Sequence, residues 1–251
     1  MSLLDTISKP EDREVICTIL GDAGLGKTSL AATFPNPIFI RVEDGLQAIP
    51  LENRPDAFPV LSTADDLWVQ LKTLINEEHE YKTVVIDSVT ALERMFIESV
   101  VASDPKKPKS INQALGGYGA GLTAVAALHG RVRKACGLLN KKGLHIVFIA
   151  HADTETVDLP DSEPYTKYSL RLGKKSTAPY VDDVDLVGFI KLQSFVKASE
   201  NNGKQKIISD GSRVLSVSAT ASNVSKNRYG ITDDLACEQG VNPFTNIIKG
   251  L

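Results

Sequence analysis

The stretch LGDAGLGKTSLAATF, residues 20–34, restricts the possible folds of this chain more than any other. Within it, Gly21 and Gly26 bracket four residues and are followed by Lys27 and Thr28, which fits the pattern G-x-x-x-x-G-K-[ST]. Glycines at these positions let backbone N–H groups converge on phosphate oxygens, and the first turn of a following helix adds partial positive charge. The stretch therefore predicts a phosphate cradle between a strand and a helix, and it disfavours a plain glycine-rich turn.

The residues on either side of this loop supply the strand and the helix that the pattern requires. EVICTIL (14–20) is an apolar run typical of a buried strand, and a helix is expected from Lys27 to about Phe34. In such a loop the lysine reaches the outer phosphates of a nucleotide, and the hydroxyl of Thr28 binds magnesium. We expect phosphate contacts from Gly21, Asp22, Ala23, Gly24, Leu25, Gly26, Lys27, Thr28 and Ser29.

Short apolar runs alternate with amphipathic helical patterns along the first part of the chain. This alternation indicates an α/β fold in which a mostly parallel sheet has helices on both faces. The expected strands are 14–20, 36–43, 82–88 and 144–150, and the expected helices are 63–78, with Thr63 as N-cap, about 90–101 and 121–140.

Shorter apolar runs and turn residues after about Tyr165 predict a C-terminal antiparallel extension of the same sheet. The expected strands there are 185–193, 204–209 and 213–219, with turns at 201–203 and 210–211.

The composition is that of an ordinary globular protein with no overall attraction for polyanions. Hydrophobic residues make up 42% of the chain, charged residues make up 24%, and the net charge is −3. Cys17, Cys136 and Cys237 are far apart and lack CxxC spacing, which disfavours a disulfide framework or a zinc site and fits a reducing compartment. Since no apolar run of 18 residues is present, we expect a soluble cytoplasmic protein without a membrane partner.

Three strand ends carry side chains suited to a magnesium–nucleotide site. TVVIDS places Asp87 after an apolar run, where a carboxylate can hold magnesium together with Thr28. IFIRVEDG ends near Glu43 and Asp44, and a carboxylate there can accept a proton from water lined up on the γ-phosphate. We favour Glu43 for this role, with Asp44 as the alternative. His151 follows LHIVFIA, and we expect it to sense the γ-phosphate.

These strand ends resemble those of RecA-type recombinases. TVVIDSVTAL (83–92) is similar to their magnesium-site strand, and FIRVEDGL (39–46) looks like the strand that carries their catalytic glutamate. IVFIAH (146–151) resembles the strand that ends in their phosphate-sensing glutamine, with His151 in its place. Over nearly its whole length the chain resembles phage-encoded RecA-like nucleotide-binding proteins, which are grouped with single-strand annealing proteins. The segments that carry this narrower likeness are 165–176, 181–189 and 225–235.

The resemblance implies one RecA-like ATPase domain over residues 1–251. The implied cofactors are ATP and Mg²⁺, and the implied reaction is ATP hydrolysis stimulated by DNA, in a homo-oligomer with ATP at the subunit interfaces. If a phage encodes the chain, the compartment is the cytoplasm of the host cell. The expected parts are an N-terminal tail (1–13), a P-loop core (14–164), a C-terminal β extension (165–222) and a C-terminal inter-subunit segment (223–251).

SKNRYG (225–230) resembles the Lys-x-Arg-x-Gly element that RecA-fold replicative helicases insert into a neighbouring subunit's ATP site. By this likeness, Lys226 and Arg228 would neutralise charge on the γ-phosphate in trans. Lys174 and Lys175 are rival candidates, because RecA-type filaments also use a lysine pair from the neighbour. A solvated basic turn is the other interpretation of residues 225–230.

A basic segment between two expected helices is the candidate nucleic-acid interface. From Pro105 to Ala152 the chain has no Asp or Glu, although it is acidic overall. Within this span an irregular glycine-rich loop occupies the position of the first DNA-facing loop of the RecA family. Its lysines can neutralise a phosphate backbone and its aromatic ring can stack on a base. The candidate DNA-contacting residues are Lys106, Lys107, Lys109 and Tyr118.

The position of the second DNA-facing loop, residues 152–168, is acidic in its first part and would repel phosphates. Our leading hypothesis is nevertheless an ATP-dependent protein that acts on single-stranded DNA in phage recombination, with a single-strand-binding protein as a further partner. The alternative is a nucleotide switch that regulates a partner without touching DNA. A small-molecule kinase is disfavoured because no arginine-rich lid is visible. A Ras-like GTPase is disfavoured because NKKG (140–143) lacks the aspartate that reads guanine.

Overall fold

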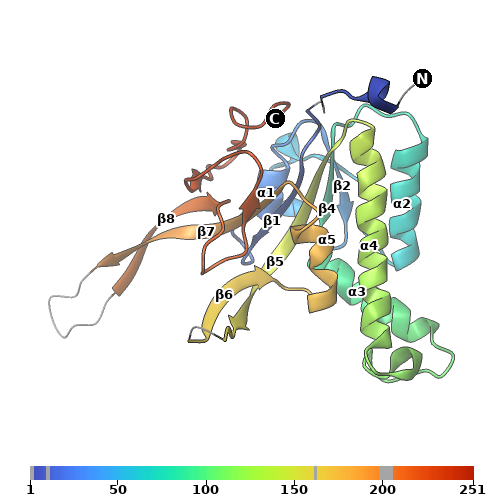
Figure 1. Ribbon diagram of the computed structural model, residues 1–251. Coiled ribbons are helices and arrows are strands. Elements are labelled where there is room, and N and C mark those ends of the chain that lie inside the picture. The colour runs from blue at the N-terminus through green and yellow to red at the C-terminus, as the bar shows by residue number, and fades with distance from the viewer. Residues whose placement is uncertain (1–2, 10–11, 161–162, 198–205) are drawn as a thin grey trace.

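The computed structural model describes residues 3–9, 12–160, 163–197 and 206–251 (Figure 1). Within these ranges the chain forms one large sheet with helices on both faces, so the predicted α/β fold is confirmed. None of the helices in the described ranges combines the length and the apolar character needed to cross a membrane. The predicted turn at 201–203 lies outside the described residues.

The main strands of the sheet run parallel, so their carboxyl ends meet at one edge. β1 pairs with β5 and β7, β4 pairs with β5 and β2, and β2 pairs with β3, all in parallel. In register, Gly21 lies opposite His151, and Arg41 lies opposite Asp87. Parallel pairing therefore brings four separate segments together at this edge. The parallel strands are β1 (Ile16–Gly21), β2 (Pro37–Arg41), β3 (Asp56–Ala57), β4 (Thr83–Asp87), β5 (His145–Val157) and β7 (Leu186–Lys197).

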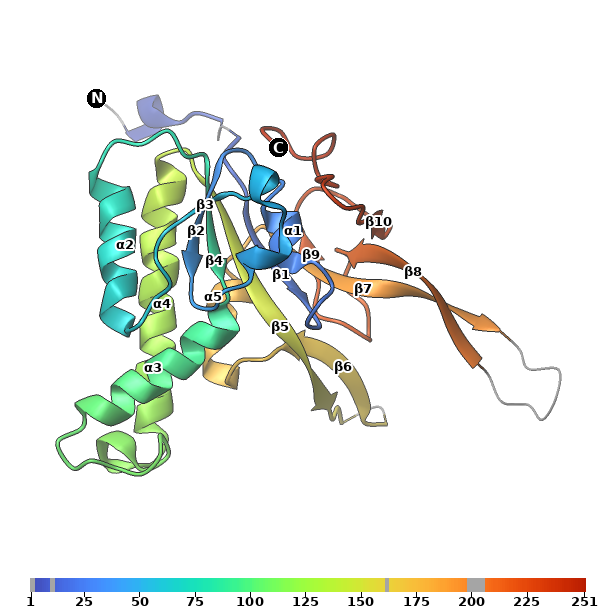
Figure 2. The same ribbon diagram turned by 180° about the vertical axis from the view of Figure 1, so that it is seen from behind.

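Antiparallel strands extend the sheet beyond β7, as predicted. The strand order is β10-β8-β7-β1-β5-β4-β2-β3, while β9 pairs with β7 and β6 pairs with β5. Seen from behind, the long β7–β8 ribbon reaches away from the body of the molecule (Figure 2). The antiparallel strands are β6 (Tyr165–Leu170), β8 (Lys206–Ser216), β9 (Lys226–Asn227) and β10 (Leu235–Ala236).

Two layers cover the sheet, each with its own apolar core. One face is covered by α2 (Ala64–Asn76), α3 (Val89–Ser103), α4 (Ala120–Lys141) and the short α5 (Ala178–Val181) (Figures 1 and 2). The other face is covered by α1 (Lys27–Ala31), nearby 3₁₀ turns and the C-terminal segment, in which Phe244 and Ile248 are buried. The 3₁₀ helices are η1 (Leu3–Thr6), η2 (Leu46–Ala48), η3 (Leu51–Asn53), η4 (Ala114–Gly116) and η5 (Lys174–Ser176).

Local sequence signals account for the helix starts. Thr63 caps α2 in a capping box with Asp66, as its N-terminal position predicted. The Ser88 side chain caps α3 directly after β4, so the chain turns sharply at the carboxyl end of that strand. Helix α1 ends at Ala31, before the predicted Phe34. Residues 33 and 34 continue in a tighter turn, because the N–H groups of Thr33 and Phe34 bond to Leu30 and Ala31, three residues back.

Residues 152–168 were expected to form a loop, but residues 152–157 and 165–168 are strands. β5 continues to Val157 and pairs antiparallel with β6, so the acidic segment is one arm of a hairpin. Across the two arms, Lys167 pairs with Glu155 at 3.2 Å. The hairpin also packs on the central sheet, where Tyr168 stacks on Phe189 of β7 with 4.9 Å between the ring centroids. The β-branched and aromatic residues that alternate along both arms favour strand.

The predicted turn at 210–211 is also wrong, because these residues lie inside the continuous strand β8. Gly211 has a φ of 84° there, and the pairing with β7 shifts register between Leu192 and Ser194. A glycine with positive φ inside a strand is typical of a bulge, which bends the strand without ending it. The two short strands predicted on either side are therefore one.

Candidate nucleotide site

The loop between β1 and α1 has the backbone of a phosphate cradle. Gly24 and Gly26 have φ values of 79° and 87°, in the left-handed region that favours glycine. Lys27 is buried, and its Nζ donates to the carbonyl oxygens of Gly21 at 2.9 Å and Asp22 at 2.8 Å. Burial lowers the pKa of Lys27, and the negative charge of Asp87 opposes that shift. The ammonium group therefore lies inside the curl of the loop, where phosphate oxygens would bind.

The first helical turn after the loop meets the end of β4. The Thr28 hydroxyl donates to Asp87 Oδ2 at 2.7 Å, and the Asp87 side chain is buried. Burial raises the pKa of Asp87, and the hydrogen bond from Thr28 opposes that shift. A Cβ atom on Gly45 would lie 3.4 Å from Thr28 Oγ1 and 3.5 Å from Asp87 Oδ2, so a glycine leaves space open beside both oxygens. A hydroxyl and a carboxylate beside open space fit magnesium.

Glu43 follows β2 and contacts Ser88, which directly follows β4, and His151, which lies within β5. Its Oε1 accepts from the Ser88 hydroxyl at 2.6 Å and lies 3.2 Å from His151 Nε2. Arg94, on the second turn of α3, is 3.9 Å from the other carboxylate oxygen. The hydrogen bond with His151 lowers the pKa of Glu43 to about 2, with a smaller contribution from Ser88. Glu43 is therefore held as a carboxylate at this edge of the sheet.

Asp44, the alternative carboxylate, faces elsewhere. Its oxygens accept from Arg41 at 3.1 Å and from Gln47 at 2.7 Å, and they have no described contact with Ser88 or His151. The structure thus brings Lys27, Thr28, Asp87, Glu43 and His151 together and leaves Asp44 outside the group.

A family comparison agrees with this geometry. A family model described as an AAA domain matches residues 13–229. The chain belongs to this family of P-loop NTPases. Among curated proteins, the AAA domain chain is similar to the SPbeta prophage-derived uncharacterized protein YorG of Bacillus subtilis (strain 168). The two are 26% identical over 191 residues, which are 74% of this chain. The aligned part spans 53% of that protein, about half of its length.

Arg213 is a residue of the AAA domain site that sequence reasoning missed. It comes from β8, and its Nη1 donates to the Leu25 carbonyl in the phosphate loop at 3.1 Å. A Cβ atom on Gly26 would collide with this guanidinium, so the glycine permits the contact. The backbone of Arg213 is itself held, because its carbonyl accepts from the Cys237 amide at 2.9 Å. No local motif marks Arg213, because Arg213 and Leu25 are 188 residues apart in the sequence and meet only in the folded chain.

A hollow of about 390 Å³ adjoins the outer side of α1. Its polar lining comes from the loop after β2 and from the C-terminal segment, and it touches Ser29 directly after Thr28. The lining residues are Ser29, Ala32, Thr33, Ala48, Ile49, Pro50, Asn53, Gln239 and Gly240.

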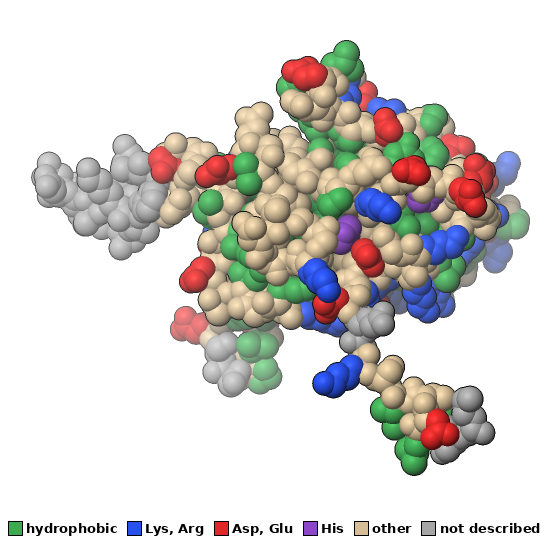
Figure 3. Space-filling model, turned by 90° about the horizontal axis from the view of Figure 1, so that it is seen from above, with side chains coloured by type: hydrophobic (Ala, Val, Ile, Leu, Met, Phe, Trp, Pro, Cys, Tyr) green, Lys and Arg blue, Asp and Glu red, His purple; other side chains and the backbone are tan. Residues whose placement is uncertain are grey.

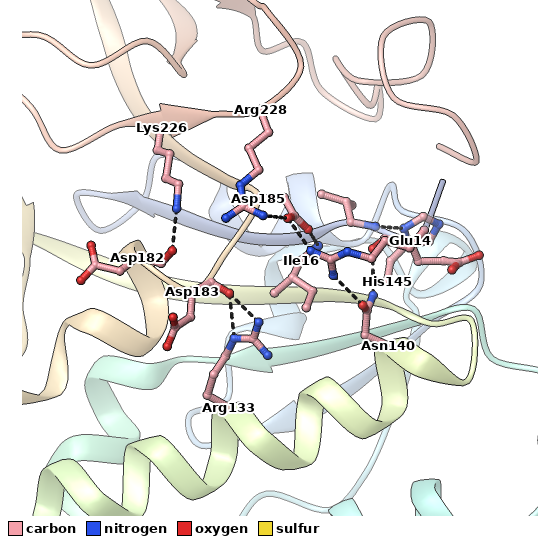
Figure 4. Close-up of polar contacts among 12 residues, drawn as sticks. Glu14, Ile16, Arg133, Asn140, His145, Asp182, Asp183, Asp185, Lys226 and Arg228 are labelled. Carbon is pink, nitrogen blue, oxygen red and sulfur yellow. Dashed lines mark hydrogen bonds and ion pairs between the residues drawn. The ribbon is translucent and has the colours of Figure 1, made fainter. Parts of the chain in front are cut away.

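Lys226 and Arg228 lie beside Asp182 and Asp185, near Ile16 at the amino end of β1 (Figure 4). Lys226 Nζ donates to the carbonyl oxygens of Val181 and Asp182, the latter at 2.6 Å. Arg228 pairs at 3.0 Å with Asp185, which also accepts from the backbone N–H of Ile16 at the start of β1. Because β1 has six residues, this cluster and the loop are roughly 20 Å apart. The structure does not bring the two groups together within one chain.

The candidate DNA residues lie in the connection between α3 and α4. Lys106, Lys107 and Lys109 are exposed, and the Tyr118 ring is fully exposed. Asp104 orders the connection by accepting from the backbone N–H groups of Lys106 at 2.9 Å and Leu115 at 2.6 Å. These residues are not part of the nucleotide group.

The rival lysine pair lies near the start of α4. Lys175 donates to the Thr123 hydroxyl at 2.8 Å, while Lys174 lines a small hollow with Glu93 and Arg171.

Proposed function

We propose that this protein binds ATP with magnesium and hydrolyses it at the edge formed by β1, β2, β4 and β5. The observation that carries this proposal is the convergence of Lys27, Thr28, Asp87 and Glu43 from three separate segments. Lys27 supplies a cation for the outer phosphates, and Thr28 and Asp87 supply two oxygen ligands for a metal. Glu43 supplies a carboxylate for the attacking water.

The residues divide the chemistry between them. The loop N–H groups and Lys27 hold the phosphates, while Thr28 and Asp87 would hold magnesium, which when bound neutralises phosphate charge. Glu43 stays ionised at neutral pH and can accept a hydrogen bond or a proton from the attacking water. His151 fixes the position of that carboxylate through their 3.2 Å contact and lies beside Gly21 in the sheet.

We infer further that the nucleotide is shared between subunits of a homo-oligomer. Lys226 and Arg228 are cationic and lie far from the phosphate loop of their own chain, so a neighbouring subunit is where they would reach a phosphate. Lys174 and Lys175 remain the rival pair. In this proposal the segment 223–251 contributes to the subunit interface.

We propose single-stranded DNA as the macromolecular substrate, in phage recombination of the annealing type. Three exposed lysines and a fully exposed tyrosine lie in the same connection between α3 and α4, and no acidic residue lies between them in the sequence. Tyr118 has a φ of 50°, and non-glycine residues in this region are often found at functional sites. The similarity to a prophage-derived protein supports a phage origin. A single-strand-binding protein is the expected further partner.

A nucleotide switch without DNA is the second candidate, and the β5–β6 hairpin favours it. The hairpin begins directly after His151 and carries Asp153, Glu155 and Asp158, which would repel phosphates. A contact between Glu43 and His151 gives this hairpin a direct connection to the nucleotide edge. In this reading the hairpin presents an acidic surface to a protein partner.

One experiment separates the two candidates. Phosphate release from ATP is measured with magnesium, in the presence and absence of oligothymidine, while light scattering reports the mass of the particle. The recombination proposal expects faster hydrolysis and larger particles with the oligonucleotide. Equal rates and masses, together with no single-strand affinity at low salt, would leave the switch as the better account.

A further inference from the structure

A groove of about 1170 Å³ lies between the outer surfaces of α2 and α4, and the nucleotide site does not use it. Its floor is apolar and its rim is basic. The residues that line it are Arg13, Ile16, Asp65, Trp68, Val69, Leu71, Lys72, Ile75, Arg131, Arg133, Lys134, Ala135, Gly137, Leu138, Asn140 and Lys141.

The apolar floor comes from helical spacing on both helices. On α2, Trp68, Lys72 and Ile75 follow one another at four and three residues, which places them on one stripe facing α4. On α4, the residues Arg131, Ala135 and Leu138 form the matching stripe. Leu138 remains 52% exposed and Val69 62% exposed, so these large aliphatic side chains keep much of their surface in water. An apolar floor of this kind is typical of a binding site.

The rim carries a strong excess of positive charge. Seen from above, Lys and Arg side chains are interspersed with Asp and Glu side chains over the surface (Figure 3), so the excess is local and comes from the residues that line the groove. Arg13 and Arg133 already pair with Asp185 and with the Asp183 carbonyl. Among the described residues that line the groove, Lys72, Lys134 and Lys141 have no described ion pair or side-chain hydrogen bond. Asp65 is the one acidic residue in that described lining. A partner here must therefore bring negative charge as well as apolar side chains.

Arg131 decides between a protein and a nucleic acid as that partner. Its guanidinium lies over the Trp68 ring, 4.5 Å from the centroid, and covers the face on which a base would stack. The edge of a stacked guanidinium stays available, and it matches a carboxylate with two parallel hydrogen bonds. Single-stranded DNA would gain little from the aliphatic floor, whereas an amphipathic helix would bury it.

We propose that this groove binds an acidic amphipathic helix of a partner protein. Its apolar face lies on Val69, Leu138 and the Trp68–Arg131 pair, and its carboxylates contact Lys72, Lys134 and Lys141. The site is separate from ATP hydrolysis, so it serves to recruit the partner.

Trp68 is the one tryptophan of the chain, which gives the groove its own reporter. The probe is an 18-residue helical peptide with leucine at three- and four-residue spacing and glutamate on the flanks of that stripe. A titration of the full chain is expected to give a saturable change in Trp68 emission. A peptide with glutamine in place of every glutamate is expected to bind at least tenfold more weakly.

Matched variants localise the binding. Lys134→Glu with Lys141→Glu is expected to weaken the acidic peptide at least tenfold, and Val69→Ser with Leu138→Ser is expected to weaken both peptides. Lys9→Glu with Lys82→Glu makes the same charge change at two exposed residues that do not line the groove, and it should leave the affinity unchanged. All variants should retain the wild-type rate of ATP hydrolysis and the wild-type circular dichroism, which keeps this test independent of the catalytic proposal.

Two results would overturn the proposal. One is equal peptide affinity before and after the reversal of Lys134 and Lys141. The other is a saturable change in Trp68 emission with oligothymidine that disappears in that variant, because the groove would then be a nucleic-acid site.

Discussion

Arg213 is the residue whose position says most about how this nucleotide site is built. Its guanidinium holds the backbone of the phosphate loop from outside, through Leu25, while Lys27 holds it from inside. The loop N–H groups must point inward at fixed angles to bind phosphate. A contact that fixes the loop carbonyls therefore organises the donors before the nucleotide arrives.

Arg213→Ala is expected to raise the dissociation constant for ATP about tenfold, which corresponds to about 1.4 kcal/mol. The reason is that the loop must then be ordered at the moment of binding. Equilibrium binding of a fluorescent ATP analogue measures the effect, and Arg213→Lys should restore part of it. Arg171→Ala, which removes another arginine near Lys27, is the control for lost charge. An unchanged dissociation constant in Arg213→Ala would show that the contact does not organise the loop.

Glu43 and Asp44 show why adjacent carboxylates are not equivalent. Both follow β2, which ends at Arg41, yet Glu43 contacts Ser88 and His151 while Asp44 contacts Arg41 and Gln47. Because both residues follow the same apolar run, the sequence favoured Glu43 and kept Asp44 as the alternative. The partners of Glu43 distinguish the two, because Ser88 directly follows β4 and His151 lies in β5.

At the scale of elements, apolar periodicity and capping residues predicted the strands and helix starts that depend on neighbouring residues alone. The apolar runs of β1, β2, β4 and β5 and the cap of α2 follow from periodicity and capping, and the strand ends located Asp87 and His151. The β5–β6 hairpin, the bulge in β8 and the approach of Arg213 depend on pairing between distant segments. Turn residues such as those at 210–211 cannot reveal a bulge, because the same pair suits both structures.

The connection between α3 and α4 gives a prediction at this scale. If Lys106, Lys107 and Lys109 contact the phosphate backbone, single-strand affinity falls with salt, with a slope of about −0.7 per contact. Reversing all three lysines to glutamate should weaken binding for every base sequence and flatten that slope. Fluorescence anisotropy of labelled oligonucleotides at several salt concentrations measures both.

Tyr118→Ala is the matched control, because it removes a ring and leaves the charge unchanged. A stacked base makes this change cost roughly 1–3 kcal/mol without altering the salt slope. A slope that stays at the wild-type value after the lysine reversal would exclude this connection as the DNA contact.

At the scale of the whole molecule, the buried His129 couples stability to pH. It lies in the core against Phe96 and Tyr180, its Nδ1 is 2.6 Å from the Tyr180 hydroxyl, and burial lowers its pKa to about 4. In the unfolded chain the group titrates near 6.5. Between these values the unfolded state binds more protons than the folded state does. The contribution of neutral His129 to the free energy of unfolding is therefore complete above pH 6.5 and is lost as the pH falls toward 4.

Protonation of His129 is expected to lower the free energy of unfolding by up to about 3 kcal/mol near pH 4. Urea unfolding at pH 7 and pH 4.5 measures it, and His129→Leu should remove much of the difference even if it lowers stability at both pH values. His79→Leu, which changes a histidine outside this buried cluster, is the control. A pH dependence that is the same in His129→Leu and the wild type would contradict this assignment.

The sharing of one nucleotide between subunits is also a property of the whole molecule. Mixing an Arg228→Ala subunit with a Lys27→Ala subunit should restore part of the ATPase activity, because each supplies what the other lacks. The measurement is the rate at several mixing ratios, with mixed oligomers verified by mass. No recovery at any ratio would count against Arg228 acting in trans, and Lys175→Ala in the same scheme tests the rival pair.

The central claim is that one edge of the sheet hydrolyses magnesium–ATP with Glu43 directing the water. The most direct measurement is phosphate release by Glu43→Gln beside ATP binding by the same protein, with Asp44→Asn as the adjacent control. We predict that Glu43→Gln binds ATP normally and slows release by 10²–10⁴-fold, the usual range for loss of a general base, while Asp44→Asn stays near the wild-type rate. Rapid release by a folded Glu43→Gln protein, or a larger loss in Asp44→Asn, would contradict the account.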